Sequence, residues 1–287
     1  MADKQRYKYF SYIEKKSVSL HPLMGTPIVT LTTDWGSRGI FAGMVKGALC
    51  SMIDGVRIVD IDHNIEPFNK ISATFVVRHA CTGFPAGTVH IIDVDSNLTP
   101  DQPFIALRSR GQYYVCCDNG LPTAALGDSI DEAVEIPVKE GGIYNFAAYT
   151  VFSQVAAAII SGTPIDELGP RREQLTQLIQ PRYIKVGDSY RIFVHYIDTY
   201  GNIYLGMSYQ EFEQLRQGRP FMLQVRDKII TEITGSYLPA AGDNDPRRRL
   251  RLTVSSTGLL ELAYSEGSFQ QLVSGLKAGE SVMLTFR

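Results

Sequence analysis

Hydrophobic and polar positions alternate in regular blocks from residue 28 onward. Residues 28–33 form an apolar, β-branched run that is typical of a strand buried on both faces. Apolar residues then recur at helical spacing over 41–52, and a second strand is expected over 56–62. A helix over 71–82 and a strand over 88–95 follow. This order predicts a parallel α/β layer with right-handed crossovers.

The pattern changes character in the second half of the chain. Residues 104–109 and 112–117 predict a hairpin, and residues 146–160 predict an apolar helix rich in alanine. Beyond Tyr183 the apolar segments are short and alternating, with turn residues between them; they are 190–196, 221–225, 250–254, 259–264 and 282–286. Such segments are typical of a small antiparallel sandwich or barrel.

These patterns together predict a chain of two domains. We expect an extension over 1–27, then an α/β domain with a mostly parallel sheet over 28–182. A smaller all-β, barrel-like domain is expected over 183–287, with the boundary within 180–187.

Composition and charge narrow the function classes. Lys and Arg total 28 against 30 Asp and Glu, a net charge of −2, which argues against a nucleic-acid partner. The apolar runs are too short to cross a bilayer, and the first residues lack the apolar middle of a secretory signal. Four cysteines make no disulfide framework, and neither C-x-x-C nor H-E-x-x-H is present. We therefore expect a cytoplasmic protein with reduced cysteines, no membrane partner and no metal.

Acidic side chains stand at the carboxyl ends of the early strands, where ligands bind in a parallel α/β sheet. They are Asp34, Asp60, Asp62, Asp93 and Asp95, with Asp118 and Asn119 after the hairpin. A carboxylate there can accept hydrogen bonds from both hydroxyls of a ribose, and Asp34 is the best candidate. Each acid taken alone is better explained as a helix cap or a turn residue than as a ligand-binding group. Several acids at one edge favour a site for a polar ligand.

The usual phosphate signals are missing from the sequence. No Walker motif is present and no G-x-G-x-x-G follows the first strand, which favours a nucleoside without a phosphate chain. Gly43 and Gly47 lie within a predicted helix, where close packing against the sheet explains them as well as a ligand does. Asp60 and Asp62 share one face of a strand and His63 is expected across from them, as a cap and not a metal ligand.

Two further turns carry polar residues in the second half. Residues 197–202 present an acid, an aromatic ring and an amide together, although an ordinary hairpin turn needs no function. Residues 255–263, followed by Glu266-Gly267-Ser268, also read as a hairpin.

Six sequence blocks in order resemble one family. The segment 32–36, with Gly43-Met44-Val45-Lys46-Gly47 after it, resembles the opening of the S-adenosylmethionine (SAM) hydroxide adenosyltransferases, relatives of the fluorinating and chlorinating enzymes. The later blocks that resemble the family are 59–65, 84–90, 118–121, 198–202 and 258–263. The resemblance implies an α/β domain, a barrel-like domain and a homotrimer. Each site would lie between the first domain of one subunit and the second domain of the next.

The resemblance also implies roles for residues around the sugar. Asp34 would hold the ribose hydroxyls, and Phe68 and Phe146 would pack near the sugar and the sulfonium. Asp95 matches the catalytic aspartate that orients the attacking water. An aromatic face suits a sulfonium, since the ring quadrupole attracts cations.

The remaining implied roles fall in the second domain. Asp198 and Ser256 would bind the methionine moiety, Tyr200 would lie against adenine, and Asn202 would bond the edge of the base. SAM is then the substrate, and no further cofactor is implied.

The chain departs from the family pattern near the reacting centre. The hydrolases carry an Asp-Arg-His set, but Gln102 stands at the Arg position and Ala147 at the His position. Tyr149, Arg108 or Arg110 could replace the missing groups. The halide enzymes' small hydroxyl pocket is not reproduced either: Leu98 and Ala148 stand where a Thr and a Ser are expected.

Three hypotheses follow for the activity. The first is SAM hydrolysis by attack of water at C5′, giving adenosine and methionine, slowly because Gln102 carries no charge and Ala147 no donor. The second is a catalytically impaired nucleoside-binding homologue, acting as a sensor or a structural trimer. The third is a changed reaction on a related adenosyl substrate.

Overall fold

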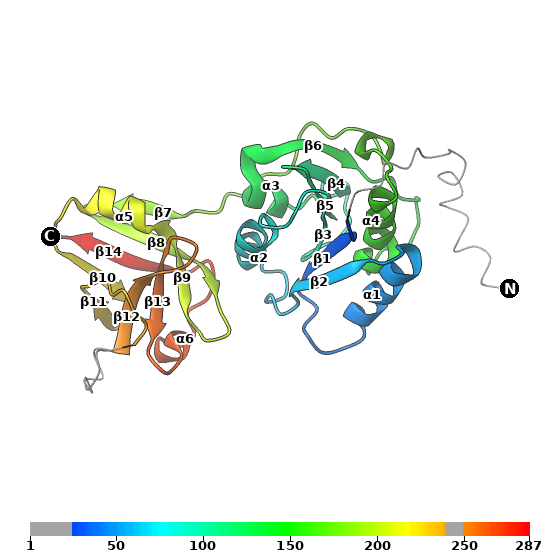
Figure 1. Ribbon diagram of the computed structural model, residues 1–287. Helices are drawn as coiled ribbons and strands as arrows, with labels where there is room; N and C mark the ends of the chain where they lie inside the picture. The colour runs from blue at the N-terminus through cyan, green and yellow to red at the C-terminus, as the bar shows by residue number, and fades with distance from the viewer. Residues whose placement is uncertain (1–24, 239–248) are drawn as a thin grey trace.

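The computed structural model describes residues 25–238 and 249–287, and its elements are labelled in Figure 1. The first domain contains a six-stranded sheet in the order β2-β1-β3-β5-β4-β6. The strands are β1 (Ile28–Thr33), β2 (Arg57–Asp62), β3 (Val89–Asp93), β4 (Phe104–Ser109), β5 (Gln112–Cys117) and β6 (Ile130–Glu135). The pairings among β2, β1, β3 and β5 are parallel, and β4 pairs antiparallel with both neighbours. The expected α/β fold is confirmed, as a mixed sheet.

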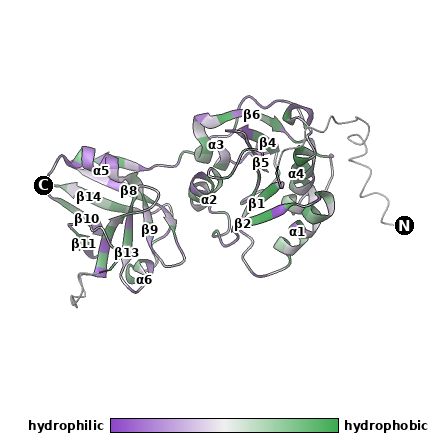
Figure 2. Cartoon of the chain, viewed as in Figure 1, coloured by the Kyte–Doolittle hydropathy of each residue, from purple (hydrophilic) through white to green (hydrophobic). Residues whose placement is uncertain are grey.

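Helices cover both faces of this sheet, so apolar side chains on both faces of the strands are buried (Figures 1 and 2). α1 (Phe41–Met52) and α4 (Ser153–Ile160) pack on one face, and α2 (Lys70–Val76) and α3 (Leu121–Leu126) pack on the other. Cys117 belongs to the first core and Cys116 to the second, as expected for neighbours in a strand.

Two of the expected helices, over 71–82 and 146–160, each contain a π-helical turn. α2 continues into η1 (Val77–Cys81), and η3 (Ala148–Phe152) precedes α4. Such turns insert one residue and frequently occur at functional sites. The periodicity over each segment remains helical, so the sequence pattern alone did not reveal them.

The glycines of α1 differ from the expectation that they pack against the sheet. Gly43 and Gly47 are exposed, and a Cβ built on either would meet no atom within 4 Å. Val45 and Leu49 are the α1 residues that face the sheet. The helix therefore turns its glycines outward, although a helical glycine costs about 1 kcal/mol relative to alanine.

The second domain is an all-antiparallel, nearly closed, barrel-like sheet. The strand order is β11-β10-β14-β8-β9-β13-β12, with β7 beside β8. The strands are β7 (Tyr183–Val186), β8 (Ser189–Ile197), β9 (Ile203–Ser208), β10 (Phe221–Val225), β11 (Lys228–Ile230), β12 (Leu250–Val254), β13 (Leu259–Tyr264) and β14 (Ser281–Phe286). Two short helices accompany them, α5 (Tyr209–Arg216) and α6 (Phe269–Leu272). The predicted barrel-like class is confirmed.

Aromatic stacking joins the two domains within one chain. The ring of Phe75 in α2 stacks on Tyr196 of β8, with centroids 4.7 Å apart and planes 5° from parallel. Phe75 also lies 5.1 Å from the ring of Tyr204 in β9. Among the described residues, no helix is long and apolar enough to cross a membrane.

Candidate functional site

Asp34 follows β1 and connects two loops at the carboxyl end of the sheet. Its Oδ2 accepts a hydrogen bond from the backbone N–H of Phe68 at 2.9 Å and a longer one from that of Asp95 at 3.4 Å. Three residues that the sequence predicted for the site are therefore brought together. Asp34 therefore also has a structural role, in agreement with the alternative expectation that the acids cap helices or turns.

Asp95 sits in a turn that several side chains fix. Its φ is +51°, a left-handed conformation that costs a non-glycine residue energy and is common where backbone geometry serves function. The side-chain amide of Asn119 donates to the carbonyls of Val94 and Asp95, at 3.0 and 3.1 Å. The carboxylate accepts from Asn97 Nδ2 at 3.3 Å, and Lys70 Nζ lies 3.4 Å from Oδ2. The sequence analysis missed Lys70, which begins the helix after the 59–65 block.

Asp93 lies beneath this turn and is buried. Burial, with a contribution from the nearby charge of Asp34, raises its pKa to about 6 against opposing hydrogen bonds. A carboxyl group with this pKa is partly protonated just below neutral pH. The negative charge at this edge of the sheet therefore depends on pH between about 5 and 7.

An aromatic cluster lies beside the acids. Trp35 makes an edge-on contact with Phe146, with centroids 5.0 Å apart, and Phe41 contacts the same ring at 5.1 Å. Tyr149 also stacks on Phe146, with ring centroids 6.0 Å apart. Phe68 is 67% exposed with φ of +65°, so its ring faces solvent in the single chain.

His63 is placed differently from the expectation. Its Nε2 lies 3.2 Å from Asp60 Oδ1, and its Nδ1 shares a 2.7 Å hydrogen bond with the hydroxyl of Thr33. The prediction that it lies across from Asp60 was wrong, because the chain leaves the strand at Asp62 and turns back. Partial burial opposes ionisation of Asp60, but hydrogen bonds from Lys46 and His63 lower its pKa overall.

Asp118 holds the connection between the domains and takes no part in the site. Its side chain is fully buried, and its two oxygens accept from Arg172 Nε at 2.6 Å and from the backbone N–H of Thr176 at 2.9 Å. The suggestion that it joins a ligand site at the strand ends was wrong. Among the described residues, no group of three or more His, Cys, Asp or Glu could hold a metal ion.

The second group of predicted residues forms one turn in the barrel domain. Asp198 Oδ1 accepts from the backbone N–H groups of Tyr200 and Asn202, both at 2.9 Å, and Oδ2 accepts from the Asn202 side chain at 3.1 Å. Tyr200 is 77% exposed. The turn therefore presents its ring outward on a rigid base, with Asn202 half-buried behind it.

Ser256 lies in the exposed turn between β12 and β13. No hydrogen bond, ion pair or ring contact among the described residues joins this turn or the Asp198 turn to Asp34, Phe68, Asp95 or Phe146. Within one chain the structure thus yields two separate groups of predicted residues.

Of the three residues considered as replacements for the missing Arg and His, Arg108 and Arg110 lie elsewhere, whereas Tyr149 belongs to the aromatic cluster beside the acids. Arg108 in β4 pairs with Glu132 of the edge strand β6 at 3.0 Å, and Arg110 lies in the β4–β5 turn. That turn bonds to the loop before β3, at the opposite end of the sheet from Asp95. Tyr149 stacks on Phe146, and Ala147 is buried in the core.

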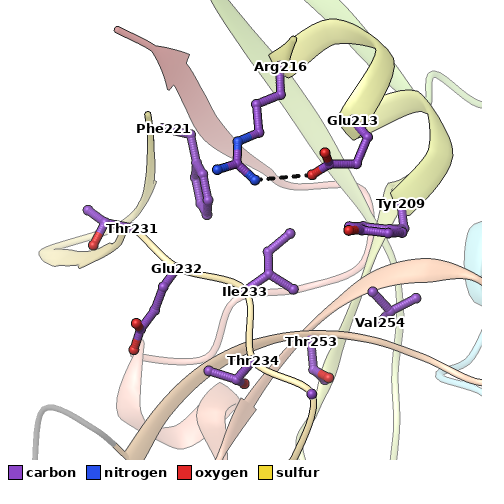
Figure 3. A pocket seen from close by; sticks show the side chains of 11 residues that line it. Tyr209, Glu213, Arg216, Phe221, Thr231, Glu232, Ile233, Thr234, Thr253 and Val254 are labelled. Atoms are coloured by element: carbon purple, nitrogen blue, oxygen red, sulfur yellow. Dashed lines mark hydrogen bonds and ion pairs between the residues drawn. The ribbon is translucent and has the colours of Figure 1, made fainter. Parts of the chain in front are cut away.

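A pocket of about 670 Å³ lies in the barrel domain, and none of the predicted site residues lines it (Figure 3). Figure 3 shows Arg216 extended toward Glu213, with nitrogen and oxygen 3.2 Å apart. None of its lining residues was predicted from the sequence. The pocket carries no pair of groups arranged for the chemistry considered above.

Comparisons with known proteins match the whole described fold. The (R)-S-adenosyl-L-methionine hydrolase of Salinispora tropica is 27% identical over 269 residues, covering 91% of this chain and 98% of that protein. The protein of the same name from Methanocaldococcus jannaschii is 28% identical over 254 residues, covering 82% and 88%. A fluorinase from an Actinoplanes species is 21% identical over 302 residues, covering 92% and 99%.

A solved structure agrees with the fold. An uncharacterized conserved protein from Thermotoga maritima superposes with a TM-score of 0.76 at 25% identity, covering 90% of this chain and 99% of that one. Models of the SAM hydroxide adenosyltransferase N-terminal and C-terminal domains match residues 29–169 and 193–283. Since the two matches span most of the chain, this protein belongs to the SAM hydroxide adenosyltransferase family.

Proposed function

We propose that this protein binds SAM, or adenosine, between subunits and hydrolyses SAM to adenosine and methionine. The observation that carries the proposal is the carboxylate of Asp34, whose Oδ2 secures the loops of Phe68 and Asp95. Among the described residues, Oδ1 has no hydrogen-bond partner, so it is free to accept from a ribose hydroxyl. The hydrolase names of the relatives support the same reaction.

The protein promotes this reaction mainly by aligning the water with C5′ of the ribose. Water attacks C5′ of the ribose, a C5′–O bond forms, the C5′–S bond breaks, and the electron pair stays on sulfur as methionine leaves. The sulfonium is already a good leaving group, so positioning and desolvation of the water dominate the barrier. Asp95 accepts a hydrogen bond from that water and receives its proton.

The alternative function is nucleoside binding without catalysis. Gln102 and Ala147 favour it, because neither supplies the charge or donor that the intact hydrolases carry. In this case SAM or adenosine would bind and no methionine would form.

We further propose a homotrimer in which the second domain of one subunit completes the site of another. The exposed face of α1 supports this, since Ile40 and Phe41 are 70% and 45% exposed beside the outward-facing Gly43 and Gly47. Small residues on an apolar face let another chain approach closely. The Tyr200 ring, exposed in the single chain, would then lie against the adenine.

The decisive experiment is incubation of the purified protein with SAM, with adenosine and methionine measured by chromatography. We expect both products in equal amounts, and loss of at least about a hundredfold in kcat for Asp95→Asn. Asp227→Asn is the matched control, since Asp227 is an exposed acid in the other domain. Binding without turnover in the parent protein would establish the alternative instead.

Oligomeric state is tested separately by light scattering at micromolar protein. We expect the mass of three chains, and a reduced mass for Gly47→Arg, which places a long cation on the exposed α1 face. A stable monomer would contradict the shared site.

A further inference from the structure

Lys70 is a charged residue beside the proposed nucleophile position that no sequence motif identified. Its Nζ lies 3.4 Å from Asp95 Oδ2, and the two side chains are only 26% and 24% exposed. Asp95 is its one ion-pair partner among the described residues. Since an ammonium carries three N–H bonds, two remain for other partners.

The backbone around Lys70 is fixed by the same carboxylate that fixes Asp95. Asn69 caps the start of α2 through a 3.0 Å hydrogen bond from Ser72 N to its Oδ1. Phe68, one residue earlier, holds a left-handed φ of +65° while its N–H donates to Asp34. Lys70 therefore lies two residues after the backbone N–H that donates to Asp34 Oδ2, and the backbone N–H of Asp95 donates to the same oxygen. The backbone positions of the two charged residues are therefore fixed by hydrogen bonds near the ion pair.

Lys70 is a cation at an edge of the sheet where negative charge gathers. Asp34, Asp93 and Asp95 gather three carboxyl groups, and repulsion from Asp34 contributes to the raised pKa of Asp93. Lys70 pairs with one of these three carboxylates, that of Asp95. The side chains at the expected Arg and His positions, by contrast, are neutral.

We propose that Lys70 is a catalytic residue that supplies the positive charge missing at the expected Arg position, which rests on the hydrolase function proposed above. One N–H of the ammonium donates to the attacking water while Asp95 accepts from it. As the C5′–O bond forms and the C5′–S bond breaks, the water proton passes to Asp95 and then to solvent. The ammonium stabilises the hydroxide-like oxygen during this step, and Lys70 keeps its own proton.

The test compares Lys70→Met with Lys70→Arg. Met keeps the length and the apolar stem without the charge, whereas Arg keeps the charge. For Lys70→Met we expect kcat for SAM to fall about a hundredfold, with KM and the calorimetric Kd for adenosine within about threefold of the parent. Lys70→Arg should recover activity to within about tenfold of the parent. Lys228→Met is the control, because Lys228 also pairs with an aspartate but lies in the barrel domain.

The outcomes separate this proposal from the function on which it rests. If the parent protein turns SAM over and Lys70→Met retains its kcat, the role of Lys70 is overturned and the hydrolase function stands. Equal losses of adenosine affinity and turnover, without recovery in Lys70→Arg, would show a structural role only. Absence of turnover in the parent would overturn both.

Discussion

Lowering the pH from about 8 to about 5 should destabilise the first domain, because His90 is buried there in its neutral form. The residue is fully buried in β3, with Nδ1 sharing a 2.7 Å hydrogen bond with Thr30 Oγ1 and its ring stacked on Tyr114. Burial lowers the pKa of His90 to about 3, although a hydrogen bond with Gln112 opposes the shift. Protonation inside the core is therefore strongly unfavourable.

The magnitude follows from proton linkage. In the unfolded chain the pKa of His90 is the ordinary 6.5, so the unfolded state binds the proton first as the pH falls. The stabilisation is fully present above about pH 6.5 and is lost progressively toward pH 3. Each pH unit in this window costs about 1.4 kcal/mol, hence about 2 kcal/mol at about pH 5. That is a sizeable share of a typical stability of about 5–15 kcal/mol.

The assay is urea unfolding of the parent protein and His90→Asn at the two pH values. Trp35, the single tryptophan, lies in the first domain and reports its unfolding by fluorescence. Asparagine keeps a short polar side chain toward Thr30 but does not titrate. Asp93 acts in the opposite direction, since its pKa of about 6 lies above the ordinary value of 3.8, and its effect cancels because both proteins contain it. We expect the parent to lose about 2 kcal/mol more than the variant.

Parallel losses of stability in the two proteins would refute the reasoning. They would mean that His90 either protonates within the folded domain or is already exposed at about pH 5. A larger loss in the variant would also contradict the assigned sign.

Three further outcomes are expected. Arg172→Met leaves the buried carboxylate of Asp118 without its cation and should cost about 3–5 kcal/mol in urea unfolding followed by circular dichroism; an unchanged midpoint would show that the Arg172 pair is dispensable. Gly201→Ala introduces a Cβ that collides with Ser268, at a backbone φ of +79° that alanine rarely adopts. The free energy of unfolding of the barrel domain should fall by about 1–3 kcal/mol, measured as a lower thermal midpoint. An unaltered midpoint would count against the turn geometry. Asp34→Ala should weaken adenosine binding about ten- to hundredfold in calorimetry; lost stability with full affinity would leave Asp34 a structural residue only.

Local pattern was sufficient for the fold class of both domains. The apolar run over 28–33 predicted β1, and the alternating segments after Tyr183 predicted β8, β10, β12, β13 and β14 but not β7, β9 and β11. Burial on one or both faces of a strand is recorded in the order of its apolar residues. The π-helical turns η1 and η3 left no such trace. A single inserted residue changes the backbone hydrogen bonding while the segment remains apolar.

The acids at the strand ends also show what the sequence predicts and what depends on the tertiary structure. The sequence identified Asp34, Asp93, Asp95 and Asp118 as one set, because all follow parallel or adjacent strands. Their partners separated them: Asp118 lies under Arg172, whereas Asp34 and Asp95 share a loop contact. Which carboxylate meets which donor depends on segments that are distant in the chain.

The sequence by itself determined the order of elements, the change from an α/β pattern to an all-β pattern, and the family resemblance. Each of these depends on residues near one another along the chain. Only the tertiary structure decided that Lys70 faces Asp95 and that Gly43 and Gly47 turn outward. Lys70 and Asp95 are brought together because the loop before α2 and the turn after β3 each donate a backbone N–H to Asp34. Such a contact is set by the packing of elements, and no periodicity within either segment records it.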